Sequence, residues 1–237
     1  MIPGLIIFDC DGVLIDSELI ACAADAEELT RIGYPISVEE VVRRFSGVPS
    51  REMYAQIEKE MGRSLPAGLD QRIEQRVLRH YREDLKPIAW VRETIAALNW
   101  PFCVASSSRP QKLGLGLIET GLFDLCYPNI FSASLVARGK PAPDLFLFAA
   151  RKMKVEACRC VVIEDSIAGV TAGRRAGMRV LGFLGGSHCA TEQGNALRRA
   201  GAELVFDSFN MIPAIVRDLP ERGPSESGPS ESGTAVS

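Results

Sequence analysis

The sequence predicts an α/β fold in which helices cover a parallel sheet, with an all-helical domain inserted after the first strand. Short apolar runs alternate with helical patterns through most of the chain, which is typical of a parallel sheet buried on both faces. The long segment between the first and second runs contains helical patterns only. A chain of 237 residues can bury one main core together with a smaller insertion.

Five apolar runs are predicted to be buried strands because each is short and bounded by polar residues or glycine. They are residues 5–8, 102–105, 161–163, 180–183 and 204–206. Helical patterns follow between the later runs, at residues 144–154 and 168–176. Ligands of such sheets bind beyond the carboxyl ends of the strands, so polar residues that directly follow these runs are candidates for a functional site.

The inserted domain is expected to span residues 16–86, between two parts of a core at 1–15 and 87–220. Its helices are predicted at residues 17–31, 38–45, 51–61 and 70–83, and Ser37 followed by Glu40 is a typical helix start. The two connections to the core, near residues 15–17 and 84–86, would form a hinge that lets the inserted domain close over a substrate.

The last segment, residues 221–237, is predicted to be a disordered tail. It contains the repeat Gly-Pro-Ser-Glu-Ser at 223–227 and 228–232 without an apolar residue. Such a sequence cannot bury enough surface to offset the entropy lost on ordering.

Two carboxylates follow the first strand, at Asp9 and Asp11. Side chains alternate along a strand, so both point the same way if the chain stays extended. Two carboxylates so close together repel each other. Such a pair therefore attracts a cation, or one of the two carboxyls is easily protonated. Phosphoryl transfer through an aspartyl-phosphate needs this combination of a nucleophile, an acid/base and a metal. The alternative is a surface strand end with two solvated acids.

Residues 9–14 (Asp-Cys-Asp-Gly-Val-Leu) resemble the opening motif of the haloacid dehalogenase-like superfamily, in its phosphatase and phosphomutase branch. Three further segments that resemble motifs of this family follow in order, at residues 104–109, 139–144 and 161–169. The resemblance implies a Rossmann-like core and identifies the inserted domain as a helical cap.

The resemblance also implies roles for four acidic residues. Asp9 would be the nucleophile and a metal ligand, and Asp11 would be the general acid/base, with its backbone carbonyl facing the ion. Asp165 would be the second carboxylate ligand, and Glu164 a weaker one acting through a bound water. Magnesium is implied because a carboxylate attacks a phosphate dianion only when charge is neutralised. Residues 164–166 also suit a helix start, and both interpretations can hold together.

Three residues are expected to bind the transferred phosphate. Ser106 ends its strand with a hydroxyl, Lys140 would clamp the phosphate charge, and Gly12 would allow a close backbone approach. The alternative for Lys140 is a solvated surface lysine. For Ser107 and Ser108, capping of the next helix is an equal alternative to phosphate binding.

Substrate choice is expected to depend on the cap. Residues 45–51 resemble the substrate-specificity loop of this branch, with Gly47 for the turn and Arg51 to grip a second anionic group. A solvated arginine at a helix start is the alternative for Arg51.

Three functions compete. The first is a magnesium-dependent phosphatase of small metabolites, for which sugar or sugar-acid phosphates are the expected substrates; local sequence is most similar to bacterial 6-phosphogluconate phosphatases. The second is a sugar phosphomutase of the β-phosphoglucomutase type, in which a cap histidine restrains the acid/base. The matching position here is near Ala21 and has no histidine, which would leave Asp11 free to activate water. The third is a catalytically silent binding or regulatory module.

Composition limits the partners. The net charge of −3 and the absence of a basic block argue against nucleic acid as a partner. No signal peptide or membrane span is visible, so we expect no membrane contact and a cytoplasmic location. The expected partner is a small phosphate ester, bound by a monomer or weak dimer.

Overall fold

The computed structural model describes residues 3–45, 48, 50–189 and 192–220, and its centre is a six-stranded, fully parallel sheet with the order β3-β2-β1-β4-β5-β6. The predicted α/β fold is therefore confirmed. Strand β1 (Leu5–Phe8) lies in the middle, between β2 (Phe102–Ser106) and β4 (Cys160–Glu164). The strand order reverses beside β1, so its carboxyl end meets those of both neighbours.

The outer strands are β5 (Arg179–Phe183), β6 (Leu204–Phe206) and β3 (Ile130–Ser132). The sequence did not predict β3, which pairs with β2 alone at one edge of the sheet. Its sequence is Ile-Phe-Ser, so only two apolar residues stand together between Asn129 and Ser132, and so short a run does not predict a strand.

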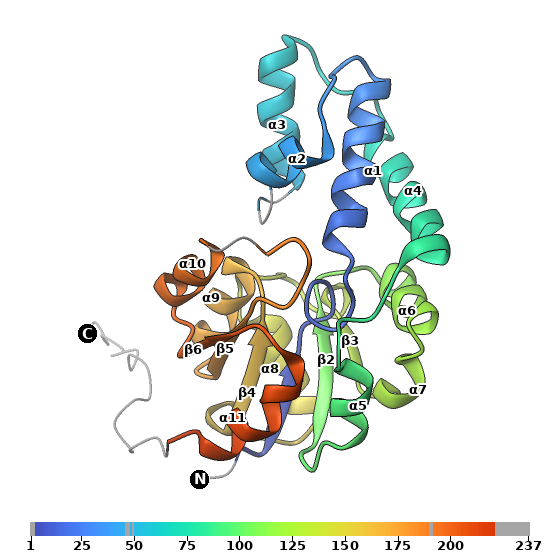
Figure 1. Ribbon diagram of the computed structural model, residues 1–237. Coiled ribbons are helices and arrows are strands. Elements are labelled where there is room, and N and C mark those ends of the chain that lie inside the picture. The colour runs from blue at the N-terminus through green and yellow to red at the C-terminus, as the bar shows by residue number, and fades with distance from the viewer. Residues whose placement is uncertain (1–2, 46–47, 49, 190–191, 221–237) are drawn as a thin grey trace, which may run out of the picture.

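Helices cover both faces of the sheet (Figure 1). One face packs against α8 (Asp144–Lys152), α9 (Ile167–Arg175) and α10 (Gln193–Ala200). The opposite face packs against α5 (Val91–Ala96), α6 (Pro110–Glu119), α7 (Phe123–Cys126) and α11 (Ile212–Asp218). Short 3₁₀ turns lie at Ala133–Leu135, Ala157–Arg159 and Phe209–Met211.

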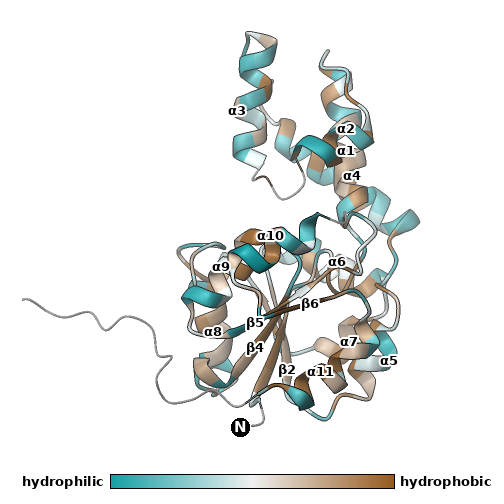
Figure 2. Cartoon of the chain, turned by 60° about the vertical axis from the view of Figure 1, so that its left-hand side comes forward, coloured by the Kyte–Doolittle hydropathy of each residue, from teal (hydrophilic) through white to brown (hydrophobic). Residues whose placement is uncertain are grey.

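The strands owe their two buried faces to their sequence. In β1, Ile6 and Phe8 join one apolar cluster while Leu5 and Ile7 join the other, because successive side chains alternate. Figure 2 shows the strands in the colour of hydrophobic residues between helices of mixed colour.

The helical cap consists of α1 (Glu18–Arg31), α2 (Val38–Phe45), α3 (Ser50–Met61) and α4 (Leu69–Asp84), and it stands beyond the carboxyl ends of the strands (Figure 1). The backbone N–H of Glu40 donates to Ser37 Oγ at 3.2 Å, which confirms the predicted start of α2.

A buried carboxylate joins the two cap helices that connect to the core. Glu28 of α1 has only 2% of its side chain exposed, and it accepts hydrogen bonds from Arg72 (3.3 Å) and Arg76 (3.0 Å) of α4. These contacts hold α1 and α4 together as a pair.

The two connections between cap and core lie side by side. The backbone N–H of Asp16 donates to Lys86 O at 3.0 Å, and that of Ile88 donates to Leu14 O at 3.0 Å. This is the arrangement that a hinge requires.

Within the described ranges, every helix is too short or too polar to span a lipid bilayer. The segment predicted to be a disordered tail, 221–237, lies outside the described residues.

Candidate active site

Three carboxylates meet where β1 and β4 end. Asp9 follows β1, Glu164 ends β4 and Asp165 comes next, and the backbone N–H of Asp9 donates to Ile163 O at 3.0 Å. One oxygen from each carboxylate lies within 4.8 Å of the others, and all three residues are buried. The side chain of Asp11 is not part of this cluster, so only its backbone carbonyl is left for the ligand role expected of it.

Lys140 is the cation of this cluster, not a surface residue. Its Nζ lies 2.6 Å from Asp9 Oδ1 and 2.7 Å from Glu164 Oε1, and it donates to Ala105 O at 3.0 Å. The side chain is 4% exposed and passes over the ring of Phe146. The alternative of a solvated lysine is therefore wrong.

The cluster carries more negative than positive charge. Burial raises the pKa of Asp9 well above its usual value, although the ammonium of Lys140 opposes the shift. Burial also raises the pKa of Asp165 to about 7. Because these pKa values stay high although a lysine lies beside the carboxyls, the cluster has too little positive charge to balance three carboxylates. An all-oxygen set of this kind is what Mg²⁺ binds, so the residues present fit a magnesium ion.

Two glycines allow the cluster to form. Gly12 has a φ of +75°, and a Cβ there would lie 1.9 Å from Asp165 Oδ2. The turn and close approach expected of Gly12 are thus present, while the phosphate it was expected to face is not tested. A Cβ at Gly169 would lie 1.7 Å from Glu164 Oε1. Either side chain would displace a carboxylate of the cluster.

The start of α9 fixes one of these carboxylates. Ser166 Oγ accepts a hydrogen bond from the Gly169 N–H at 3.0 Å and caps the helix. The same hydroxyl and the Ser166 N–H both donate to Glu164 Oε2 at 2.9 Å. Ser166 therefore both caps the helix and orients Glu164, the candidate ligand.

Asp11 is held by several polar groups instead of being free. Its Oδ1 accepts hydrogen bonds from Ser17 Oγ at 2.7 Å and Tyr81 OH at 3.0 Å, and lies 3.1 Å from Lys112 Nζ. Its Oδ2 accepts a hydrogen bond from Ser108 Oγ at 2.6 Å. The expectation that the missing cap histidine leaves Asp11 unrestrained is wrong, because hinge, cap and core residues replace it.

These contacts also set the charge of Asp11. Burial by itself would raise the pKa of this carboxyl, but Lys112 and the hydroxyls of Ser108 and Ser17 outweigh it and hold the pKa well below its usual range. Asp11 is therefore ionised in this conformation.

Ser106 at the end of β2 and Ser108 just beyond it both contact Asp11. Ser106 is fully buried at the strand end, where its Oγ lies 3.4 Å from Asp11 Oδ2 and accepts from the Ser108 N–H at 3.0 Å. Helix α6 begins at Pro110, after Arg109, whose side chain does not cap it. The helix-cap alternative is wrong for Ser108, because its hydroxyl donates to Asp11 instead.

His188 is a member of the site that the sequence did not predict. It follows β5 in a loop, and its Nε2 lies 3.2 Å from Asp165 Oδ2. Burial by itself would lower its pKa, but Asp165 and Cys189 raise it to about 10. No motif surrounds His188, and only its place after the carboxyl end of a strand could have pointed to it.

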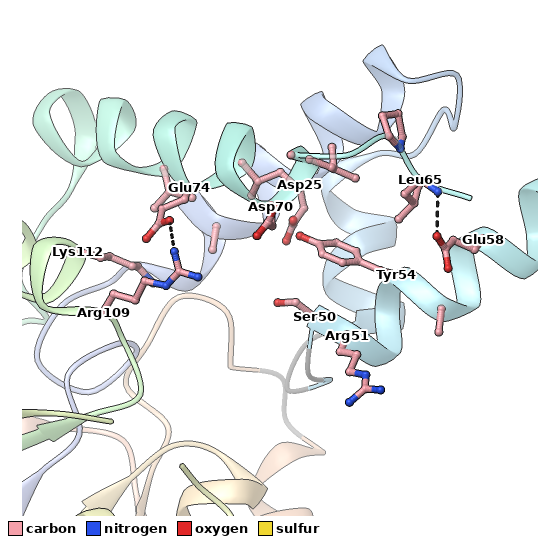
Figure 3. Close-up of a pocket in the computed structure, with 17 residues that line it drawn as sticks. Asp25, Ser50, Arg51, Tyr54, Glu58, Leu65, Asp70, Glu74, Arg109 and Lys112 are labelled. Atoms are coloured by element: carbon pink, nitrogen blue, oxygen red, sulfur yellow. Dashed lines mark hydrogen bonds and ion pairs between the residues drawn. The ribbon is translucent and has the colours of Figure 1, made fainter. Parts of the chain in front are cut away.

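A cavity of about 760 Å³ lies between the cap and this edge of the core (Figure 3). Helices α1, α3 and α4 contribute most of its lining, and Arg109 and Lys112 contribute from the core. Arg51 is exposed at the lower margin, and its side chain points away from Tyr54 (Figure 3). Gly47, the other predicted cap residue, lies outside the described residues.

Comparison with known proteins gives a consistent family. A family model described as haloacid dehalogenase-like hydrolase matches residues 3–177. The 6-phosphogluconate phosphatase of Escherichia coli is 30% identical over 184 residues, or 77% of this chain and 83% of that relative. The phosphorylated carbohydrates phosphatase of Thermotoga maritima is 30% identical over 202 residues, or 83% of this chain and 91% of that relative.

A solved structure agrees with these relatives. A haloacid dehalogenase-like protein from Agrobacterium tumefaciens is 41% identical and superposes with a TM-score of 0.83, covering 90% of this chain and 97% of that chain. The likeness thus includes both the core and the cap.

Proposed function

Since the chain belongs to the haloacid dehalogenase-like hydrolases and is a phosphoric monoester hydrolase, we propose that it is a Mg²⁺-dependent phosphatase of sugar or sugar-acid phosphates. The observation that carries the proposal is the position of Asp9, which shares a buried cluster with Glu164, Asp165 and the ammonium of Lys140. The names of the two curated relatives, both phosphatases, support the substrate class.

In the first step, an Asp9 oxygen attacks the phosphorus of the ester and forms an aspartyl-phosphate. The bond between phosphorus and the leaving oxygen breaks, and this oxygen takes its electron pair together with a proton from Asp11. Asp11 is ionised while Lys112 and the serine hydroxyls hold it, so it must first leave these contacts and take up a proton from solvent. Lys140 orients the nucleophile and offsets charge on the transferred group, and Ser106 and the backbone at Gly12 would bind the phosphoryl oxygens.

In the second step, Asp11 takes a proton from water, and the oxygen of that water attacks phosphorus. The bond to Asp9 breaks, which frees phosphate and restores the carboxylate. A magnesium ion held by Asp9, Asp165, the Asp11 carbonyl and, through water, Glu164 would neutralise charge on the phosphate.

A sugar phosphomutase is the second candidate, on one observation. Tyr81 of the cap and Ser17 of the hinge hold the Asp11 carboxylate, as a mutase would need to protect its phosphorylated aspartate from water. The intact cluster of Asp9, Lys140 and Asp165 argues against a silent binding module.

The test is a phosphate-release screen of metabolite phosphates with Mg²⁺ and with a chelator. We expect release that requires both the ion and Asp9, and Asp9→Asn with wild-type activity would remove the nucleophile from the proposal. Asp11→Asn is expected to accumulate phosphorylated Asp9, detectable by intact-protein mass spectrometry.

The two candidates are separated with β-glucose 1-phosphate as substrate. Free phosphate identifies a phosphatase. Glucose 6-phosphate formed without phosphate release identifies a mutase.

A further inference from the structure

The cavity beneath the cap lies next to the candidate active site, and Lys112 joins the two. Lys112 lines the cavity and also lies 3.1 Å from Asp11 Oδ1, the proposed acid/base. A phosphate ester attacked by Asp9 would therefore place its leaving group here. The volume of about 760 Å³ suits a small metabolite with space for water.

The positive charges that line the cavity are already paired or turned away. Lys112 is paired with Asp11, and Arg109 Nη1 lies 2.8 Å from Glu74 Oε2. Arg51 is directed away from the interior (Figure 3). Among the described residues that line the cavity, no other arginine or lysine is present.

Two carboxylates of the described lining are unpaired. Asp25 and Asp70 have no hydrogen bond or ion pair among the described residues, and Figure 3 shows them close to the hydroxyl end of Tyr54. Burial and the neighbouring carboxyl of Glu18 raise the pKa of Asp25 to about 7, although Lys112 opposes them. The interior of the cavity is thus acidic, with one phenol hydroxyl.

This chemistry favours one class of leaving group. Carboxylates accept hydrogen bonds from the hydroxyl groups of a sugar or polyol, and a tyrosine ring packs against the carbon chain of such a molecule. A carboxylate on the leaving group would instead face like charges, and Arg51, the cation of the described lining without an ion pair, is directed away from the interior (Figure 3).

We propose that this cavity selects neutral polyhydroxylated leaving groups, with Asp25 and Tyr54 as the residues that bind their hydroxyls. The proposal rests on the proposed phosphatase function and decides between the two substrate classes left open there. It assigns sugar or polyol phosphates to this chain and excludes sugar-acid phosphates as preferred substrates.

The test uses two linear substrates that differ at one carbon, D-glucitol 6-phosphate with a terminal CH₂OH and 6-phosphogluconate with a carboxylate. p-Nitrophenyl phosphate, which has no sugar hydroxyls, reports the chemical step alone. Assays are run above the Asp25 pKa of about 7, so that its carboxylate is charged.

We expect wild-type kcat/KM to favour glucitol 6-phosphate by roughly tenfold or more. Asp25→Asn keeps the shape of the side chain and removes its charge, so the ratio of the two kcat/KM values, each taken relative to p-nitrophenyl phosphate, should narrow several-fold. Glu52→Gln, an equal charge change at an exposed position of α3 outside the cavity, should keep the wild-type preference. Tyr54→Phe should raise KM for glucitol 6-phosphate with little change in kcat.

The outcomes are distinct. Equal or better turnover of 6-phosphogluconate by the wild type overturns the inference and leaves the phosphatase function intact. If the Asp25→Asn variant prefers glucitol 6-phosphate over 6-phosphogluconate as strongly as the wild type does, the inference is likewise overturned and the phosphatase function stays intact. No phosphate from any of the three substrates overturns both proposals. Should Asp25→Asn fail to fold, the KM effect of Tyr54→Phe decides.

Discussion

Replacing Lys140 by methionine tests how much one buried cation contributes to this fold. The substitution keeps the length of the side chain and removes its charge from 2.6 Å of Asp9 and 2.7 Å of Glu164. At an effective dielectric constant of about 20, each contact corresponds to ~6 kcal/mol of Coulomb energy.

The measured loss of unfolding free energy will be smaller than this Coulomb energy, because a carboxyl that loses its partner takes up a proton and becomes neutral. Removing one partner of a buried pair costs about 3–5 kcal/mol. For a protein of this size, each kcal/mol of lost unfolding free energy lowers the melting temperature by about 2–4 °C. The melting temperature in chelator should therefore fall by roughly 6–20 °C.

Calorimetry and urea unfolding measure this loss, with Lys59→Met as the control because Lys59 is an exposed lysine of the cap. Mg²⁺ should raise the melting temperature of the Lys140 variant more than that of the wild type, since the ion neutralises the same carboxylates. If Lys140→Met in chelator lies within about 1 kcal/mol of the control, the proposed charge balance of the cluster is wrong.

Two further substitutions probe the site and the cap. Gly169→Ala should push Glu164 out of the cluster and raise the Mg²⁺ concentration for half-maximal activity at least about tenfold; Gly114→Ala, in an open position of α6, should leave this concentration unchanged. Glu28→Gln should cost about 1–3 kcal/mol of unfolding free energy at neutral pH, because two arginine partners lose a charged acceptor but still reach solvent. These arginines lower the folded-state pKa of Glu28, so its stabilisation is present above its unfolded pKa and is lost as pH falls through the folded value. Urea unfolding at a series of pH values should show the two proteins converging in acid, and a constant difference would contradict this assignment.

Much of the fold could be predicted because its signals are local. The run that forms β1, the serine that starts α2 and the succession of helices in the cap each depend on residues a few positions apart. Asp9 was predicted for the same reason, since it directly follows an apolar run. The roles of Glu164 and Asp165 came instead from the resemblance of residues 161–169 to a family motif. Strand β3 was not predicted, because Ser132 limits its apolar run to two residues, whereas all three residues of the equally short β6 are apolar.

The sequence by itself determined which chemical groups stand at the ends of the strands. Only the tertiary structure decided which of them meet: Lys140 contacts Asp9 across 131 positions, and Tyr81 contacts Asp11 across 70. The cap hydroxyl on the acid/base, the histidine beside Asp165 and the acidic cavity all arise in this way. Such contacts form where the sheet and the hinge bring distant segments together, and no periodicity or spacing along the chain encodes them.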